Sequence, residues 1–172
     1  MSAITPFTKL HTAIWGLFED DTRFCQLIPP ANRVRYDKND RMPLKNDIAA
    51  ADLPEFMVVD YGGPINLNHS SSSAKVVRNY SAILNTGDYR INEFTNVLTW
   101  LMLCNIDTWQ SKLALCKWFD RSFAKVLRIT EATTGESVPQ RNRKINGFTA
   151  VWSLEVECYF QKSHLTFSET EA

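Results

Sequence analysis

Apolar residues recur every three or four positions near the start of the chain. Over residues 6–20 the apolar positions are Phe7, Leu10, Ile14, Leu17 and Phe18. This is the spacing of one helical face. Thr5 is placed to cap the helix, and Pro6 suits its first position because the missing N–H would lack a partner there anyway. The pattern predicts an amphipathic helix whose apolar stripe packs on the later strands.

A second helical pattern opens at Asp88 in the middle of the chain. Its stripe consists of Ile91, Phe94, Val97, Leu98 and Leu101, and Trp100 and Met102 widen it. A helix this apolar is expected to be covered on more than one side. Residues 107–110 (DTWQ) resemble a capping box, so either a short further helix follows or residues 113–119 are extended.

Apolar and polar residues alternate in other segments, which predicts strands. Glu55–Tyr61 (EFMVVDY) is closed by Gly62-Gly63-Pro64, the usual punctuation at the end of a strand. Residues 75–86 follow as a long strand with Val76, Tyr80, Ala82 and Leu84 on one side. Residues 123–131 also alternate, and residues 33–36 (RVRY) form a candidate edge strand.

The clearest strand pattern is the last one, from Phe148 to Phe160. One face carries Phe148, Ala150, Trp152, Leu154, Val156, Cys158 and Phe160. The other face is polar, broken only by Val151 and Tyr159. Thirteen residues at about 3.3 Å each give roughly 43 Å, more than twice the common strand length. One face is expected to cover a core, and Val151 and Tyr159 are candidate subunit-interface residues on the other.

These elements fit a single α+β domain over residues 1–164. We expect a mainly antiparallel sheet, with the N-terminal and central helices packed against it. Polar excursions at residues 32–53, 65–74 and 132–147 are expected to be long loops. The last of them joins two strands and far exceeds the usual two to five residues of a hairpin connection. Residues 165–172 are expected to be a flexible tail.

Composition narrows the function. A chain of 172 residues, 44% apolar and 22% charged, forms a core without a disulfide or metal. The formal net charge of zero argues against a dedicated nucleic-acid binder. The compact basic group Arg141, Arg143 and Lys144 lies in the 132–147 arm. It either faces the phosphates of a nucleic acid, or simply keeps a solvated loop soluble.

Residue types that carry chemistry form no recognisable site in the sequence. Cys25, Cys104, Cys116 and Cys158 include no C-x-x-C pair. The histidines His11, His69 and His164 are scattered, and no phosphate-binding glycine motif occurs. We therefore expect no enzyme activity, no cofactor and no metal. Without a secretory signal or an apolar run of about 20 residues, we expect a soluble protein made in the cytoplasm.

The order of elements resembles the tail terminator family of long-tailed bacteriophages, proteins that cap a finished tail tube and present it to the head. The likeness rests on residues 51–56 (ADLPEF) leading into EFMVVDY, on the helix that opens at Asp88, and on the closing alternation Phe148–Phe160. It covers most of the chain and is a likeness of layout rather than of a motif. Asn32–Leu53 and Ile65–Ala74 make the chain longer than compact members, so another head–tail connector or neck protein is an alternative.

The resemblance implies a structural virion protein of the tail or neck. It implies a homo-oligomeric ring, usually a hexamer, whose partners are the tail tube protein and neck or connector proteins. It makes the 132–147 arm a loop that faces the lumen or a neighbour. Arg141, Arg143 and Lys144 would then approach DNA passing through the ring or an acidic partner.

Two hypotheses from other classes stay open. A small-ligand or peptide-binding module would use Trp100, Trp109 and Trp118 to line an apolar pocket. Trp100 and Trp152 are most simply core residues, while Trp109 and Trp118 fit either a core or an interface. A thiol or serine hydrolase would have a reactive Cys25, Cys104 or Cys116.

Overall fold

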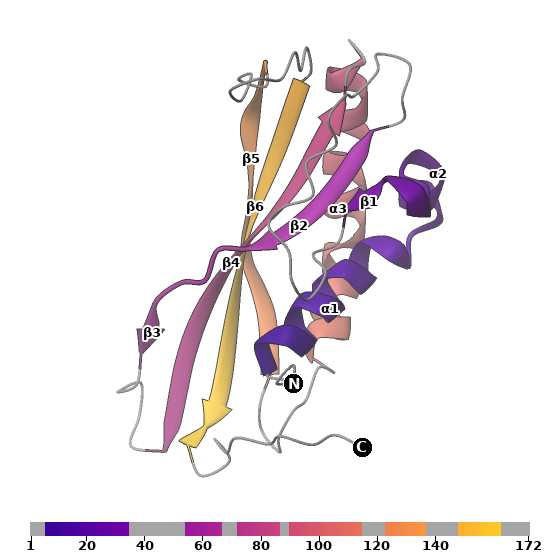
Figure 1. Ribbon diagram of the computed structural model, residues 1–172. Helices are drawn as coiled ribbons and strands as arrows, with labels where there is room; N and C mark the ends of the chain where they lie inside the picture. The colour runs from indigo at the N-terminus through magenta and orange to yellow at the C-terminus, as the bar shows by residue number, and fades with distance from the viewer. Residues whose placement is uncertain are drawn as a thin grey trace.

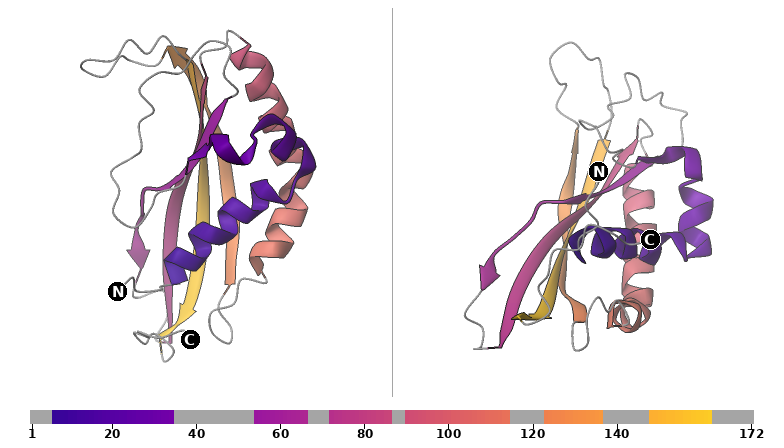
Figure 2. Two further views of the ribbon diagram at one scale, coloured as in Figure 1. Left: turned by 45° about the vertical axis from the view of Figure 1, so that its right-hand side comes forward. Right: turned by 60° about the horizontal axis from the view of Figure 1, so that its bottom comes forward.

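A computed structural model describes residues 6–34, 54–66, 72–86, 90–114, 123–136 and 148–162. Over these ranges the chain forms two layers, a twisted sheet and a set of helices that covers one of its faces (Figure 1). The left view of Figure 2 shows the described α-helices on the same side of the sheet. The predicted α+β class, with a mainly antiparallel sheet and two principal helices packed against it, is confirmed.

Within the described ranges the sheet has six strands in the order β1-β2-β4-β6-β5, and β3 also pairs with β4. The strands are β1 Arg33–Val34, β2 Glu55–Asp60, β3 Ile65–Asn66, β4 Ser73–Thr86, β5 Phe123–Glu136 and β6 Phe148–Gln161. Every pair is antiparallel except β1 with β2. The two central strands, β4 and β6, pair along their whole length, so they form the backbone of the sheet.

The predicted faces of the two central strands are confirmed. The inward residues of β6 are buried: Ala150, Trp152, Leu154, Val156, Cys158 and Phe160. They meet the predicted inward residues of β4, which are Val76, Tyr80, Ala82 and Leu84. Burying one face of each strand fixes the register, because a slip of one residue would turn every apolar side chain toward the opposite face.

The N-terminal helices cover the β2 side of this core. Helix α1 spans Pro6–Glu19 and buries its predicted stripe against β2. Helix α2 spans Thr22–Leu27 and is followed by the short 3-10 helix η1, Pro30–Asn32. Phe18 is the centre of an aromatic cluster, because its ring lies 5.0 Å from both Phe56 and Trp109 and 5.5 Å from Phe24. The cluster joins α1, α2, α3 and β2.

Helix α3 covers the β5 and β6 side of the core. It spans Ile91–Ala114 without a break, so the predicted capping box at residues 107–110 is wrong. Trp109 and Leu113 are buried and continue the inward stripe of Leu98 and Leu101. Their burial outweighs the local capping preference of Asp107, so the helix runs on.

The edge of the sheet continues past the end of β2, because β3 pairs with the same strand, β4. Asp60 pairs with Tyr80, and Ile65 pairs with Val76. The chain therefore advances five residues along the edge while β4 advances only four, which leaves one extra residue on the edge. The extra residue at Gly62-Gly63-Pro64 is therefore a bulge rather than a stop. Strand β3 and the start of β4 lie within the predicted 65–74 loop, and β5 runs on to Glu136, inside the predicted 132–147 arm.

Candidate assembly surfaces

Large apolar side chains face solvent along one line of α3. Val97 is 43% exposed, Trp100 66% and Leu103 60%. Glu93 and Asp107, both exposed, continue the same line at its two ends. The spacing of three or four residues keeps these five side chains on one side of the helix. We call Glu93, Val97, Trp100, Leu103 and Asp107 the α3 line.

The α3 line corrects two predictions. Val97 and Trp100 were expected to lie in the core stripe, but that stripe is formed by Ile91, Phe94, Leu98, Leu101 and Met102. Trp100 and Trp109 are nine residues apart, which places them on opposite sides of a helix. Trp109 is buried and Trp100 is exposed, so the two do not line one pocket. The three-residue spacing of Val97, Trp100 and Leu103 was the signal for a second stripe.

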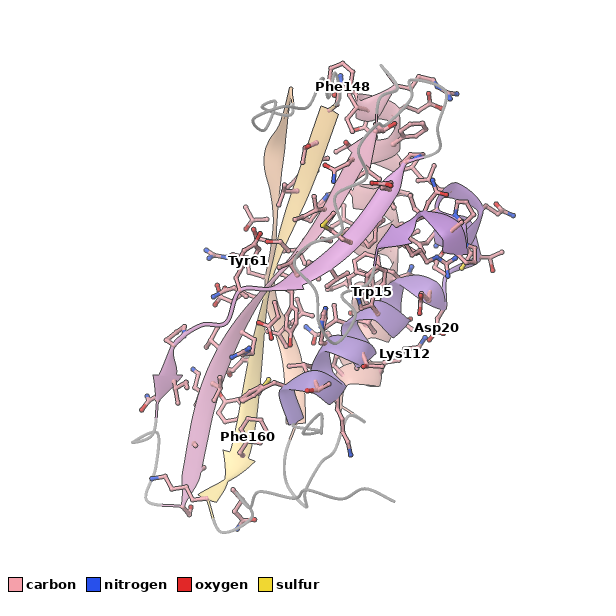
Figure 3. All side chains as sticks on the ribbon, viewed as in Figure 1. Trp15, Asp20, Tyr61, Lys112, Phe148 and Phe160 are labelled. Atoms are coloured by element: carbon pink, nitrogen blue, oxygen red, sulfur yellow. The ribbon has the colours of Figure 1, made fainter. Side chains whose placement is uncertain are left out.

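A chain of hydrogen bonds fixes α3 over the sheet. Trp152 donates from its indole Nε1 to Thr99 Oγ1 at 2.9 Å, and the Thr99 hydroxyl donates to Glu131 Oε2 at 2.6 Å. Farther along the helix, Lys112 Nζ lies 2.5 Å from Asp20 Oδ2 just after α1. Figure 3 labels these two residues. These contacts join α3 to β6, β5 and α1, so the α3 line is presented on a fixed support.

The second candidate surface is the outer face of the sheet, the face turned away from α1 and α3. Val151 and Tyr159 lie on it and are partly exposed, as the alternation of β6 predicted. Tyr61 follows β2 on the same face and is 64% exposed. Figure 3 shows Tyr61 on the side of the sheet opposite Trp15 and the helices. Sequence reasoning did not single out Tyr61.

Charged groups on the outer face are paired within it. Lys75 Nζ lies 2.7 Å from Glu157 Oε2, and the Tyr159 hydroxyl donates a short hydrogen bond to the other carboxylate oxygen. The hydrogen bond from Lys75 to Glu157 raises the pKa of Lys75. The hydrogen bond from the Tyr159 hydroxyl to Glu157 raises the pKa of Tyr159. Arg128 reaches Glu155 at 3.0 Å while its side chain stays 71% exposed. Among the described side chains of this face, Arg128 is therefore the most exposed cation.

The bulge holds Tyr61 in place. The Tyr61 N–H donates to the Asn79 carbonyl at 2.8 Å, and the Asn79 N–H donates to the Gly62 carbonyl at 2.8 Å. Gly62 has a φ of 71°, and its N–H donates to Asp60 Oδ1 at 2.8 Å. Gly62 suits this backbone because it lacks a Cβ. These hydrogen bonds fix the backbone that carries the exposed Tyr61 ring.

A polar cluster under α1 has a structural role. Asp60 Oδ2 lies 2.6 Å from Arg78 Nη2, and the Arg78 guanidinium stacks over Phe7 at 4.5 Å. Tyr80 lies beside them with its ring fully covered, and burial raises the pKa of its hydroxyl. His11 Nε2 donates to the Val58 carbonyl at 2.9 Å. The one described histidine therefore ties α1 to β2.

The other residues that the sequence marks as candidates are either described cysteines or lie outside the described ranges. The described cysteines differ in surroundings: Cys158 is buried, Cys25 donates to the Glu19 carbonyl at 3.2 Å, and Cys104 is exposed on α3. The other candidates lie outside the described residues: Arg141, Arg143, Lys144, Cys116, Trp118, His69 and His164. Their predicted roles remain predictions.

Among the described residues, no three or more His, Cys, Asp or Glu side chains gather where they could hold a metal. No helix in the described ranges has the length and apolar character to cross a membrane. Neither a protein-family model nor a curated protein matches the chain.

Proposed function

We propose that this chain is a structural assembly protein of the phage tail terminator kind. Its subunits would associate into a ring that caps the tail tube and offers a surface to the neck. The α3 line is the observation that supports this proposal most. It gives the subunit an apolar contact surface on a rigid element, as an assembly subunit requires.

The size of the α3 line supports a contact role. Single exposed apolar residues are ordinary on protein surfaces. Here three of them lie along about two turns of one helix, and together they expose roughly 300 Å² of apolar surface. Patches of roughly 300–600 Å² are the largest on a typical monomer and are often functional. A neighbour that covers the α3 line would remove this area from water.

A ring in this role has several partners and lies in the tail or neck of a virion. The first partner is another copy of the chain, and the others are the tail tube protein and neck or connector proteins of a virion. The arm with Arg141, Arg143 and Lys144 is proposed to face the lumen, where DNA passes. The neighbouring proposal, another head–tail connector protein, shares the self-association and differs in which end of the tail or head the ring occupies.

Light scattering and electron microscopy with tail tubes test the proposal. We expect a ring near six times the 19.7 kDa chain mass, or added density at one end of tubes built from the tube protein of the same genome. An unrelated protein of similar mass is the control for nonspecific sticking. Binding to a head portal but not to tubes would favour the connector role. Binding to neither, with no self-association, would reject both.

A further inference from the structure

We propose that the α3 line of one copy packs on the outer sheet face of a second copy. Trp100 would lie against Tyr61, and one acidic end of the line would approach Arg128. The contact is head-to-tail, because it joins two different surfaces. This inference rests on the self-association in the proposed function and names the surfaces that carry it.

The charges of the α3 line disfavour a contact between two α3 helices. Glu93 and Asp107 each lie seven residues from Trp100, and no Lys or Arg occurs from Ile91 to Ser111. Pairing two lines in register, parallel or antiparallel, therefore places carboxylate against carboxylate. Arg23, the cation that α2 brings near Cys104, is already paired with Asp21 at 2.8 Å. Like charges across an interface oppose association, so a surface whose cation is more exposed than Arg23 and is held by one ionic hydrogen bond instead of two fits better.

The outer sheet face offers an aromatic ring and a cation in one row. Tyr61 bonds to Asn79, Asn79 is opposite Glu155, and Glu155 is opposite Arg128. Tyr61 and Arg128 thus stand at the two ends of a row that crosses four strands. Tyr61 is 64% exposed, and the Arg128 side chain is 71% exposed. The residues between them are polar, which leaves these two as the projecting groups.

The two surfaces match in spacing. Three strand intervals of about 4.8 Å put the Tyr61 and Arg128 backbones roughly 14 Å apart. Seven residues of helix put Trp100 about 10.5 Å from Glu93 or Asp107 along the axis. The long Arg128 side chain spans the difference of a few ångströms. A helix laid across the strands can therefore place Trp100 on Tyr61 and a carboxylate on Arg128 together.

The existing pair between Arg128 and Glu155 does not prevent this contact. An exposed ion pair contributes about 0–1 kcal/mol, so Arg128 can share or exchange its carboxylate at little cost. With the exposed ring of Tyr61, the apolar core of the contact reaches about 500 Å². A stable interface buries about 1,000 Å² or more, of which somewhat over half is apolar. The remainder falls to the polar residues around the two surfaces.

The position of the surfaces has a geometric consequence. The α3 line lies on the helix layer and Tyr61 on the opposite side of the sheet (Figures 1 and 3). A subunit that uses both surfaces contacts two neighbours at once. Head-to-tail contacts of this kind build a closed ring when the rotation between copies closes, and a filament when it does not.

Complementary variants of the full chain test the pairing. Trp100→Asp blocks the α3 line and keeps the outer face intact. The double substitution Tyr61→Asp with Arg128→Glu does the reverse. Thr12→Asp adds the same charge to an exposed position of α1 and is the matched control. Circular dichroism verifies that each variant folds, which is expected because every substituted side chain is exposed.

The expected masses by light scattering are distinctive. The wild type and Thr12→Asp exceed one chain, and each blocked variant stays at 19.7 kDa. An equimolar mixture of the blocked variants gives twice the chain mass, because one intact α3 line meets one intact outer face. A contact between two α3 helices would leave the sheet-face variant associated and the mixture without a new species. Either that result or a wild type still monomeric near 1 mM overturns the pairing.

The same variants separate this inference from the proposed function. Wild-type chain that caps tail tubes while the mixture forms no pair would retain the function and reject the surfaces. A mixture that pairs as expected, with no binding of the wild type to tubes, would retain the surfaces and reject the terminator role. Mass and tube binding are thus independent readouts.

Discussion

The side-chain amide of Gln110 pairs with both backbone groups of Val126. Gln110 Nε2 donates to the Val126 carbonyl at 2.6 Å, and Gln110 Oε1 accepts from the Val126 N–H at 2.9 Å. Val126 lies on β5, the terminal strand of the described sheet, next to a register shift. A side chain of α3 therefore takes the place that the backbone of another strand would take, which blunts the edge at this point.

Replacing Gln110 tests this edge contact. We expect Gln110→Leu to lower the free energy of unfolding by about 2 kcal/mol, since two hydrogen bonds to a partly buried backbone are lost. Urea denaturation measures the change. Ser111→Ala is the control, because Ser111 bonds only locally to the Asp107 carbonyl, and it should shift stability by less than about 0.5 kcal/mol. Equal effects of the two substitutions would contradict the edge role.

Gly63 and Gly16 form a matched pair of glycine positions. A Cβ on Gly63 would lie 2.0 Å from the Val77 carbonyl oxygen, whereas a Cβ on Gly16 meets nothing within 4 Å. We expect Gly63→Ala to destabilise the fold by about 1–3 kcal/mol through forced backbone shifts. Gly16→Ala, inside α1, should stabilise it by about 0.5–1 kcal/mol. Thermal unfolding of both variants measures these changes in stability. An unchanged stability of Gly63→Ala would mean that the bulge relaxes freely.

The sheet was predictable where one face is buried along a whole strand. The inward and outward residues of β6 and β4 follow from alternation alone, because a half-buried strand needs apolar side chains on one side only. The bulge was not predictable in the same way. Gly62-Gly63-Pro64 suits a strand end and a bulge equally well, and only the pairing of Ile65 with Val76 separates them.

The candidate surfaces were predictable only in part. The outward position of Val151 and Tyr159 follows from the β6 pattern, and their role as subunit contacts stays a prediction. The sequence of α3 contains two apolar stripes, and periodicity does not say which one faces the sheet. The structure selects the stripe with Leu98, Leu101 and Trp109, since these fit against the aromatic cluster and β6. Trp100 belongs to the other stripe and is exposed to solvent.

Thr99 accepts a hydrogen bond from a buried tryptophan, Trp152. Trp152 is fully buried, and its indole N–H donates to the Thr99 hydroxyl. We expect Thr99→Val to lower the free energy of unfolding by about 1–3 kcal/mol, because the indole donor keeps its desolvation cost without a partner. Thr99→Ser keeps the hydroxyl and is the control. Urea denaturation measures the change. Equal losses for Val and Ser would point to packing rather than to the hydrogen bond.

Asp21 gives the fold a defined response to acid. Its carboxylate accepts from the Arg23 guanidinium at 2.8 Å, from Asn105 Nδ2 at 2.7 Å, and from the N–H groups of Arg23 and Phe24 at the start of α2. The hydrogen bond from Arg23 is the main cause of a pKa well below the ordinary Asp range, and the bonds from Asn105 and the backbone add to it, while burial opposes it. A depressed pKa means that the unfolded chain takes up the proton first.

The stabilisation from Asp21 is therefore complete above about pH 4, where the unfolded carboxyl is ionised, and declines as the pH falls toward its folded pKa. Asp21→Ala removes the helix cap and should lower the free energy of unfolding by about 0.5–2 kcal/mol at pH 7. Asp21→Asn keeps a capping oxygen but cannot ionise, so its deficit relative to the wild type should shrink between pH 5 and pH 2. Urea denaturation at pH 7, 5, 3 and 2 measures both differences. A deficit of Asp21→Asn that stays constant over this range would show that the charge of Asp21 does not stabilise the fold.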